Sequence, residues 1–271
     1  MLAVDLIVTG DMEHQGLAAA LAPVFPGAEF SAQKVDCFTS NKVSWPPPKA
    51  AGVKSAIEKY AAALVNAVDP GRKKRKPDFV IGIEDLELAN KGQPESVISG
   101  LRSAVIAELE NERKRRNAAS FAKLRESIRR KCSFHLFAPM PEAYFFADPA
   151  ALAATGCKRE PVLIPARDLE DFETNDAAYL SVSKPPSPWA CARELLPFHP
   201  KHYLQFLVYP ELYSETHQGV KGLLALDWRK VLGWGRADVI SSCHVSGPGV
   251  RTWSRNGRVS REASPFDPRF R

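Results

Sequence analysis

The chain has 271 residues, 45% hydrophobic and 25% charged, which is enough apolar material for a sizeable core. Its net charge of +6 and isoelectric point near 9.1 favour acidic polymers such as nucleic acid as partners, a balance that many unrelated basic proteins share. Five scattered cysteines without a Cys-x-x-Cys pair argue against a disulfide framework or a zinc site. No basic leader and no apolar run of about 18 residues is found, which predicts a cytoplasmic protein with no membrane span.

The first predicted strand covers residues 3–8 and ends at Thr9-Gly10. Asp11 and Glu13 follow in the first turn of a predicted helix, where acidic residues either cap the helix or face a site beyond the strand. A short second strand is predicted for residues 29–35. A helix with apolar side chains at steps of three and four is then expected from Ala50 to Val68.

A basic run, Arg72 to Lys76, precedes the next strand. It is either a solvated loop or a phosphate contact made by residues such as Arg72 and Lys73.

Three carboxylates follow the most apolar stretch of the first third of the chain. Residues 79–83 have the length and branching of a buried strand, and Glu84, Asp85 and Glu87 come directly after it. Chemistry in open α/β sheets collects beyond the carboxyl ends of strands. Because Mg²⁺ prefers oxygen ligands, the sequence predicts a Mg²⁺ (or Mn²⁺) site at Asp85 and Glu87, with Glu84 and Glu13 assisting. A solvated acidic loop is the alternative.

Two further helices are predicted, one beginning at Pro94 and one around residues 121–128, followed by a strand at 132–138. The first of these is expected to end in an exposed charged segment, residues 110–117. Strands that alternate with helices of this length predict an α/β fold with a mainly parallel sheet flanked by helices.

After Pro139 the regular alternation of strands and helices gives way to shorter segments. We expect a core of residues 1–138, a helical C-terminal elaboration packed on it at 139–245, and a basic tail at 246–271. Helices are predicted around residues 149–156, 203–208 and 220–232. The tail holds arginines around Trp253, a pattern that suits either a nucleic-acid backbone with a stacked base or a docking arm for a protein.

Glu142 and Lys201 are the remaining site candidates. Glu142 beside an aromatic run either lines the metal site or begins a helix after Pro141. Lys201 either binds phosphate as a point charge or is simply exposed. His199 and His202 lack a neighbouring Cys or Glu partner and are expected to be structural.

Five short motifs occur in order along most of the chain, from about Val4 to Trp234. They are Thr9-Gly10-Asp11-Met12-Glu13, Glu84-Asp85-Leu86-Glu87, Glu142-Ala143-Tyr144-Phe145-Phe146-Ala147-Asp148, His199-Pro200-Lys201 and Tyr213-Ser214-Glu215-Thr216-His217-Gln218-Gly219. Their order resembles the Toprim fold, and more closely the Toprim-like bacterial proteins of domain-of-unknown-function family 4276. Two departures stand out: Thr9 occupies the place of the family's Glu, and Glu215 that of its lysine.

The resemblance implies a Toprim-like sheet and Mg²⁺-dependent processing of phosphodiesters in nucleic acid, in a bacterial anti-phage or mobile-element setting. The catalytic set would be Glu13, Glu84, Asp85, Glu87 and Glu142. Since Thr9 has no pKa suited to proton transfer, Asp11 or Glu13 would have to supply the missing acid. The alternative is a catalytically degenerate Toprim module that binds within a larger complex, for example with an ATPase subunit.

Overall fold

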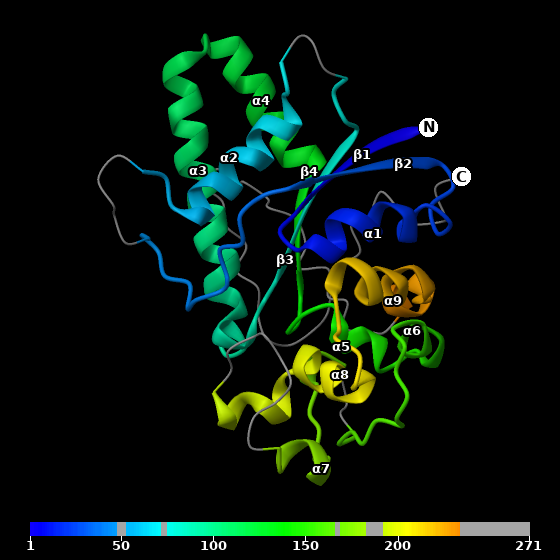
Figure 1. Ribbon diagram of the computed structural model, residues 1–271. Coiled ribbons are helices and arrows are strands. Elements are labelled where there is room, and N and C mark those ends of the chain that lie inside the picture. Colours follow the sequence, from blue (N-terminus) through cyan, green and yellow to red (C-terminus); the bar gives the residue numbers. More distant parts are fainter. Residues whose placement is uncertain (48–52, 72–74, 166–168, 183–191, 234–271) are drawn as a thin grey trace.

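A four-stranded, all-parallel sheet forms the centre of the protein in this computed structural model (Figure 1). The structure describes residues 1–47, 53–71, 75–165, 169–182 and 192–233. The strands are β1 (Leu2–Val8), β2 (Ala28–Lys34), β3 (Phe79–Asp85) and β4 (Cys132–Phe137), in the order β2-β1-β3-β4. The predicted α/β class with a mainly parallel sheet is therefore confirmed, and this layout is consistent with a Toprim-like arrangement.

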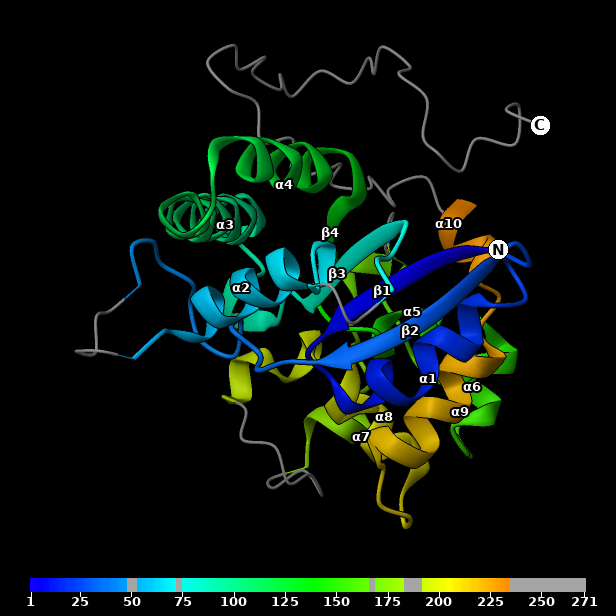
Figure 2. The same cartoon turned by 90° about the horizontal axis from the view of Figure 1, so that it is seen from above.

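Helices cover both faces of the sheet (Figure 2). One face carries α2 (Ala56–Val68), α3 (Pro94–Arg115) and α4 (Ala118–Lys131), which share an apolar core with β3 and β4. The other carries α1 (Asp11–Leu21), α5 (Glu142–Phe145), α6 (Pro149–Ala154), α8 (Pro200–Val208), α9 (Val220–Ala225) and α10 (Trp228–Gly233).

Short elements complete the part of the chain that is described. They are the 3₁₀ turns Leu88–Asn90, Leu169–Asp171 and Arg193–Phe198, the helix α7 (Ala177–Leu180) and the π-helical turn Glu215–Gly219. A third apolar cluster, centred on Tyr179, Tyr203 and Phe206, joins the C-terminal helices to one another.

Capping residues explain where several helices begin. Ser55 accepts a hydrogen bond from the Glu58 backbone N–H while the Glu58 side chain accepts one from Ser55, a capping box that starts α2 at Ala56. The predicted start at Ala50 is wrong for this reason, since Val53 to Ser55 lie outside the helix. Asn117 caps α4 by accepting a hydrogen bond from the Ser120 backbone N–H.

The charged segment predicted to be exposed at residues 110–117 is exposed, except that Glu112 is buried and Arg116 half-buried. The helix α3 continues through it to Arg115. The single helix expected at 220–232 is divided into α9 and α10 at Leu226 and Asp227.

Parallel pairing brings the ends of β1 and β3 to one edge of the sheet, because Ile7 lies opposite Gly82. Gly82 also allows the close approach of Tyr60, whose hydroxyl would lie 3.0 Å from a Cβ at this position. That hydroxyl donates to the carbonyl oxygens of Ile7 (2.9 Å) and Ile83 (3.1 Å), so α2 holds the two strand ends in register.

Among the described helices none is both long enough and apolar enough to cross a bilayer. Cys37, Cys132 and Cys157 carry free thiols.

Candidate functional site

Glu13 reaches the site by folding back over the start of its own helix. Gly10 precedes α1, and a Cβ atom there would lie 1.8 Å from Glu13 Oε2. The absence of a side chain at Gly10 therefore makes room for the Glu13 carboxylate, which is only 3% exposed. Asp11, two residues earlier, instead lies at the surface and pairs with Lys34 at 2.6 Å. It makes no capping hydrogen bond, so the capping role considered for Asp11 is not seen.

Asp85 ends β3 and Glu87 follows it in a different backbone conformation. Successive strand residues point to opposite faces, and Ile83, two residues before Asp85, packs in the α1-side core. Asp85 is thus on the α1 side, where Glu13 and Glu87 act on its charge. Glu87 has a φ of 57°, so the extended backbone of β3 ends at Asp85 and does not continue to Glu87. The two carboxylates still lie close enough to interact.

Glu84 lies on the opposite face of the sheet from Asp85. Its Oε1 accepts hydrogen bonds from Thr39 Oγ1 (2.6 Å), Cys37 Sγ (3.0 Å) and the Phe38 backbone N–H (3.3 Å). Glu84 therefore fastens the segment after β2 to the end of β3 and is not part of the acidic group on the α1 side. The strand alternation that separates these neighbours is the physical reason that the predicted role of Glu84 beside Asp85 is corrected.

Thr9 belongs to the same buried group as Glu84. Burial raises the pKa of Glu84, and hydrogen bonds from Cys37, Thr39 and Thr9 oppose this effect. The threonine that stands at the first motif thus supports a structural carboxylate.

The C-terminal helices add a buried lysine and further carboxylates to the α1 side. Lys201, in the first turn of α8, lies 3.0 Å from Glu215 Oε1 and 3.8 Å from Glu142 Oε1. The Tyr213 hydroxyl donates to Glu142 Oε1 at 3.1 Å. Glu142 itself is fully buried at the start of α5, and its Oε2 accepts no hydrogen bond from any described residue. Lys201 is 13% exposed at its side chain, so it is not the exposed lysine considered above.

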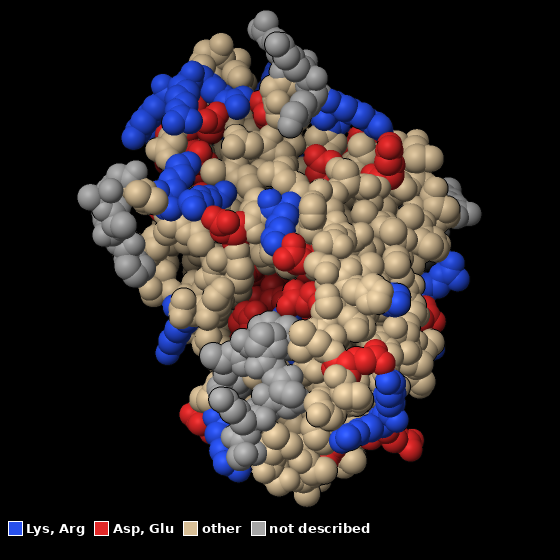
Figure 3. Space-filling view, viewed as in Figure 1, with Lys and Arg blue, Asp and Glu red and all other residues tan. Residues whose placement is uncertain are grey.

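We call this group the carboxylate–lysine cluster. Its members are Glu13, Asp85, Glu87, Glu142, Lys201 and Glu215, with Tyr213 at its edge. On the face drawn in Figure 3, Asp and Glu side chains gather in a hollow in the middle of the molecule.

The electrostatics of the cluster are dominated by burial and by repulsion between like charges. Burial, together with Glu142 and Glu215, raises the pKa of Glu13 to about 7. Burial raises the pKa of Asp85 well above its usual range, with Glu13, Glu87 and Glu142 adding to the effect. The pKa of Glu142 is raised by the same causes, burial first and Glu215 next among those that raise it. The four carboxylates whose pKa is raised, Glu13, Asp85, Glu87 and Glu142, cannot all ionise freely, so they must share protons or bind a cation.

Lys201 is the positive charge that the protein itself provides. Burial alone would lower the pKa of Lys201, but Glu142, Glu215, Asp85 and Glu87 overcome it and raise the pKa above its usual value. Lys201 is therefore held as an ammonium group among the acids.

The donor chemistry of the cluster suits a hard divalent cation, since every acidic member offers oxygen. Within the described ranges, however, no three His, Cys, Asp or Glu side chains are gathered closely enough to hold a metal ion as they stand. Within the cluster, Glu142 Oε2 is buried without a hydrogen bond and is the oxygen with the clearest need of a partner. Glu84 Oε2, on the opposite face of the sheet, is also buried without one.

The basic residues predicted to bind phosphate divide into two groups. Lys201 lies within the cluster, whereas Arg72 and Lys73 lie outside the described residues. Their neighbours Arg75 and Lys76 pair with Glu29 and Asp69 before the start of β3, at the end of the strand away from Asp85.

His199 and His202 lie side by side at the start of α8, and their structural role stays a prediction. Their rings lie 4.0 Å apart, His199 Nδ1 accepts from the His202 backbone N–H at the start of α8, and burial lowers both pKa values, to about 3 and about 4.

Tyr213 and Glu215 were not predicted as site residues. They lie in the last motif, and the π-helical turn Glu215–Gly219 carries Glu215 toward Lys201. Gly219 closes this turn where a Cβ would lie 2.7 Å from the Tyr213 hydroxyl and 2.8 Å from Met12 Sδ. The signal in the sequence was that Glu215 stands where the motif it resembles has a lysine.

No protein-family model matches the chain, and neither the curated proteins nor the solved structures include a similar one.

Proposed function

We propose that the protein processes phosphodiesters in nucleic acid with the help of a divalent cation, Mg²⁺ or Mn²⁺, bound at the carboxylate–lysine cluster. The observation that carries this proposal is the convergence of Glu13, Asp85, Glu87 and Glu142 around Lys201 at the carboxyl ends of β1 and β3. Buried like charges are costly, and a group of carboxylates that one ammonium group only partly compensates is typical of a functional site. The proposal also rests on the Toprim-like order of the motifs.

Asp85, Glu87 and Glu142 would hold the cation, which would polarise a phosphoryl oxygen and help to form the attacking hydroxide. Lys201 is an ammonium group that can bind a phosphate oxygen as a point charge.

Glu13 takes the place of the acid missing at Thr9. A pKa of about 7 suits a general acid or base at neutral pH, whereas a threonine hydroxyl cannot exchange protons in that range. Asp11 is the weaker candidate because it pairs with Lys34 at the surface.

The direct experiment is a cleavage assay on DNA and RNA with Mg²⁺ or Mn²⁺, comparing the wild type with Asp85→Ala. Cleavage by the wild type alone supports the proposal. Equal background cleavage by both proteins contradicts it.

A second candidate is a catalytically lapsed Toprim module that binds within a larger complex. Lys201 favours this reading, because an internal ammonium group already neutralises part of the cluster. Thr9 favours it too. Co-purification of an ATPase or other subunit with a protein that lacks cleavage activity supports this candidate, which fits the same cytoplasmic, anti-phage or mobile-element setting.

A further inference from the structure

The hairpin formed by α3 and α4 separates its charges between an inner and an outer side. From Glu108 to Lys131 the sequence mixes four acidic with nine basic residues, counted as Glu108, Glu110, Glu112 and Glu126 against Arg113, Lys114, Arg115, Arg116, Lys123, Arg125, Arg129, Arg130 and Lys131. In the fold, two of the acidic residues are buried and most of the basic residues are exposed.

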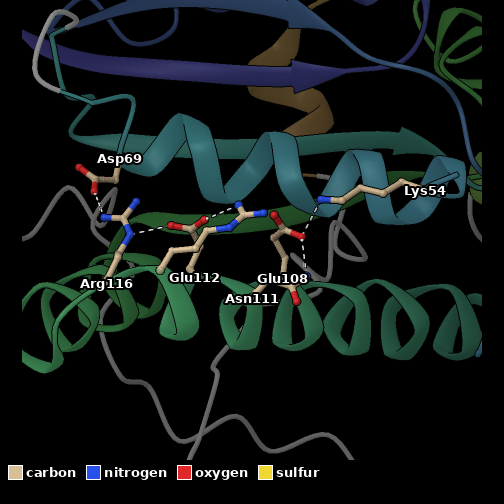
Figure 4. A network of polar contacts seen from close by, with 7 residues as sticks. Lys54, Asp69, Glu108, Asn111, Glu112 and Arg116 are labelled. Atoms are coloured by element: carbon tan, nitrogen blue, oxygen red, sulfur yellow. Dashed lines mark hydrogen bonds and ion pairs between the residues drawn. The ribbon is translucent and has the colours of Figure 1, made fainter. Parts of the chain in front are cut away.

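Two of the acids are buried against α2 (Figure 4). Glu108 accepts from Lys54 at 2.8 Å, and Glu112 accepts from Arg116 at 2.6 Å. Arg116 also pairs with Asp69 at the end of α2. These contacts hold α3 against α2 and remove the negative charge of Glu108 and Glu112 from the surface.

The outer side of the hairpin is left strongly basic. Seven cations on it are exposed, namely Arg113, Lys114, Arg115, Lys123, Arg125, Arg129 and Arg130, against the exposed acids Glu110 and Glu126. Lys114, Lys123 and Arg130 make no ion pair with another described residue. Figure 3 shows Lys and Arg side chains gathered over this end of the molecule.

The chemistry of this surface selects one class of partner. Of the large hydrophobic residues of α3 and α4, only Ile106 is exposed. A stable protein interface has an apolar, aromatic-rich centre, and an amphipathic membrane helix needs an apolar face, so neither fits. Duplex nucleic acid carries one charge per about 1.7 Å, so α4, at about 21 Å long, spans roughly 12 phosphate charges.

We infer that the outer side of the α3–α4 hairpin, defined by Lys114, Lys123 and Arg130, is a docking surface for the phosphate backbone of duplex nucleic acid. It extends the proposed function by naming where the polymer is held, but it needs no metal and no cleavage. The surface lies on the opposite face of the sheet from the carboxylate–lysine cluster. Docking there would therefore anchor a long polymer and leave another stretch of it to reach the cluster.

The test is the fluorescence anisotropy of a labelled 20-base-pair DNA duplex titrated with the full chain in EDTA at several salt concentrations. The triple variant Lys114→Gln, Lys123→Gln, Arg130→Gln is compared with a charge-matched control, Arg193→Gln, Lys221→Gln, Arg229→Gln, which removes three exposed cations from the C-terminal helices. Circular dichroism checks that both variants fold.

We expect the hairpin variant to bind at least tenfold more weakly at low salt, and its slope of log affinity against log salt to fall by about 2.7, at about 0.9 for each lost phosphate contact. The slope of the control variant should differ from that of the wild type by less than about 0.9, the contribution of one phosphate contact. Equal affinities for the two variants, or no binding by the wild type, would each overturn the inference. Because EDTA removes divalent cations, these outcomes are independent of the cleavage assay with Asp85→Ala.

Discussion

The ammonium group of Lys201 lies 3.8 Å from Oε1 of Glu142, a carboxylate that is completely buried. The pair joins α8 to α5 and places a positive charge among the acids that end β3 and begin α1. A buried charge pair of this kind is seldom retained for stability alone, because desolvation offsets much of the attraction. A cation that binds to the cluster must therefore compete with the Lys201 ammonium group for the same carboxylates.

Removing the ammonium group should strengthen cation binding and weaken the metal-free fold. In Lys201→Met, the carboxylates lose their internal counter-charge, so we expect a free energy of unfolding lower by about 3 kcal/mol without metal. Mn²⁺ should restore much of this loss and should bind more tightly than to the wild type, as measured by calorimetry and chemical denaturation. Lys221→Met, an exposed lysine on α9, is the control. Unchanged affinity in Lys201→Met would show that the ammonium group does not compete with the cation.

Glu13 should make the stability of the metal-free protein depend on pH. Its pKa rises from 4.5 in the unfolded chain to about 7 in the fold, so the folded protein holds a proton that the unfolded chain has released between these values. Stability should thus fall as pH rises from about 4.5 to about 7, by up to about 3 kcal/mol. Glu13→Gln, which stays neutral, should flatten this part of the profile and be more stable than the wild type above pH 7. An identical profile in denaturation experiments would count against the buried position of Glu13.

Gly219 should tolerate no side chain, because a Cβ there would lie within 3 Å of both Tyr213 and Met12. We expect Gly219→Ala to lower the free energy of unfolding by about 1–3 kcal/mol and to displace the tyrosine from Glu142. Gly27→Ala is a matched control, since nothing lies within 4 Å of its Cβ position. Equal stabilities of the two variants would mean that the π-helical turn adjusts without cost.

Glu84 should matter for folding and not for cation binding. Glu84→Ala leaves Thr39 and the Phe38 backbone N–H without their acceptor, which should cost about 3 kcal/mol of stability. Its Mn²⁺ affinity, measured under folding conditions, should equal that of the wild type. A large loss of affinity with intact stability would instead return Glu84 to the metal site.

Much of this architecture is predictable from local sequence patterns. The apolar runs that became β1, β3 and β4 are bounded by acids, glycine or proline, and parallel pairing alone brings Glu13 and Asp85 to one edge of the sheet. The composition of the site was not predictable in full, because it depends on the direction of side chains and on contacts between residues far apart in sequence. Strand alternation divides Glu84 from Asp85, and no local signal brings Lys201 to Glu142, which lies 59 positions earlier in the chain.

The start of α2 shows a different kind of limit. Apolar periodicity extends back to Val53, but the capping box of Ser55 and Glu58 fixes the first helical residue as Ala56. The hydrogen-bonded cap, and not the last apolar residue of the periodic pattern, determines where the helix begins.

The central claim is that the carboxylate–lysine cluster binds a divalent cation. Calorimetric titration of Mn²⁺ into the wild type, Asp85→Asn and Glu84→Gln at pH 7.5 tests it most directly, because the two substitutions neutralise adjacent acids on opposite faces of β3. The account predicts binding by the wild type and Glu84→Gln, and a loss of at least about tenfold in affinity in Asp85→Asn, on the order of 1.4 kcal/mol. Absence of binding in the wild type, or equal affinity in all three proteins, would contradict it.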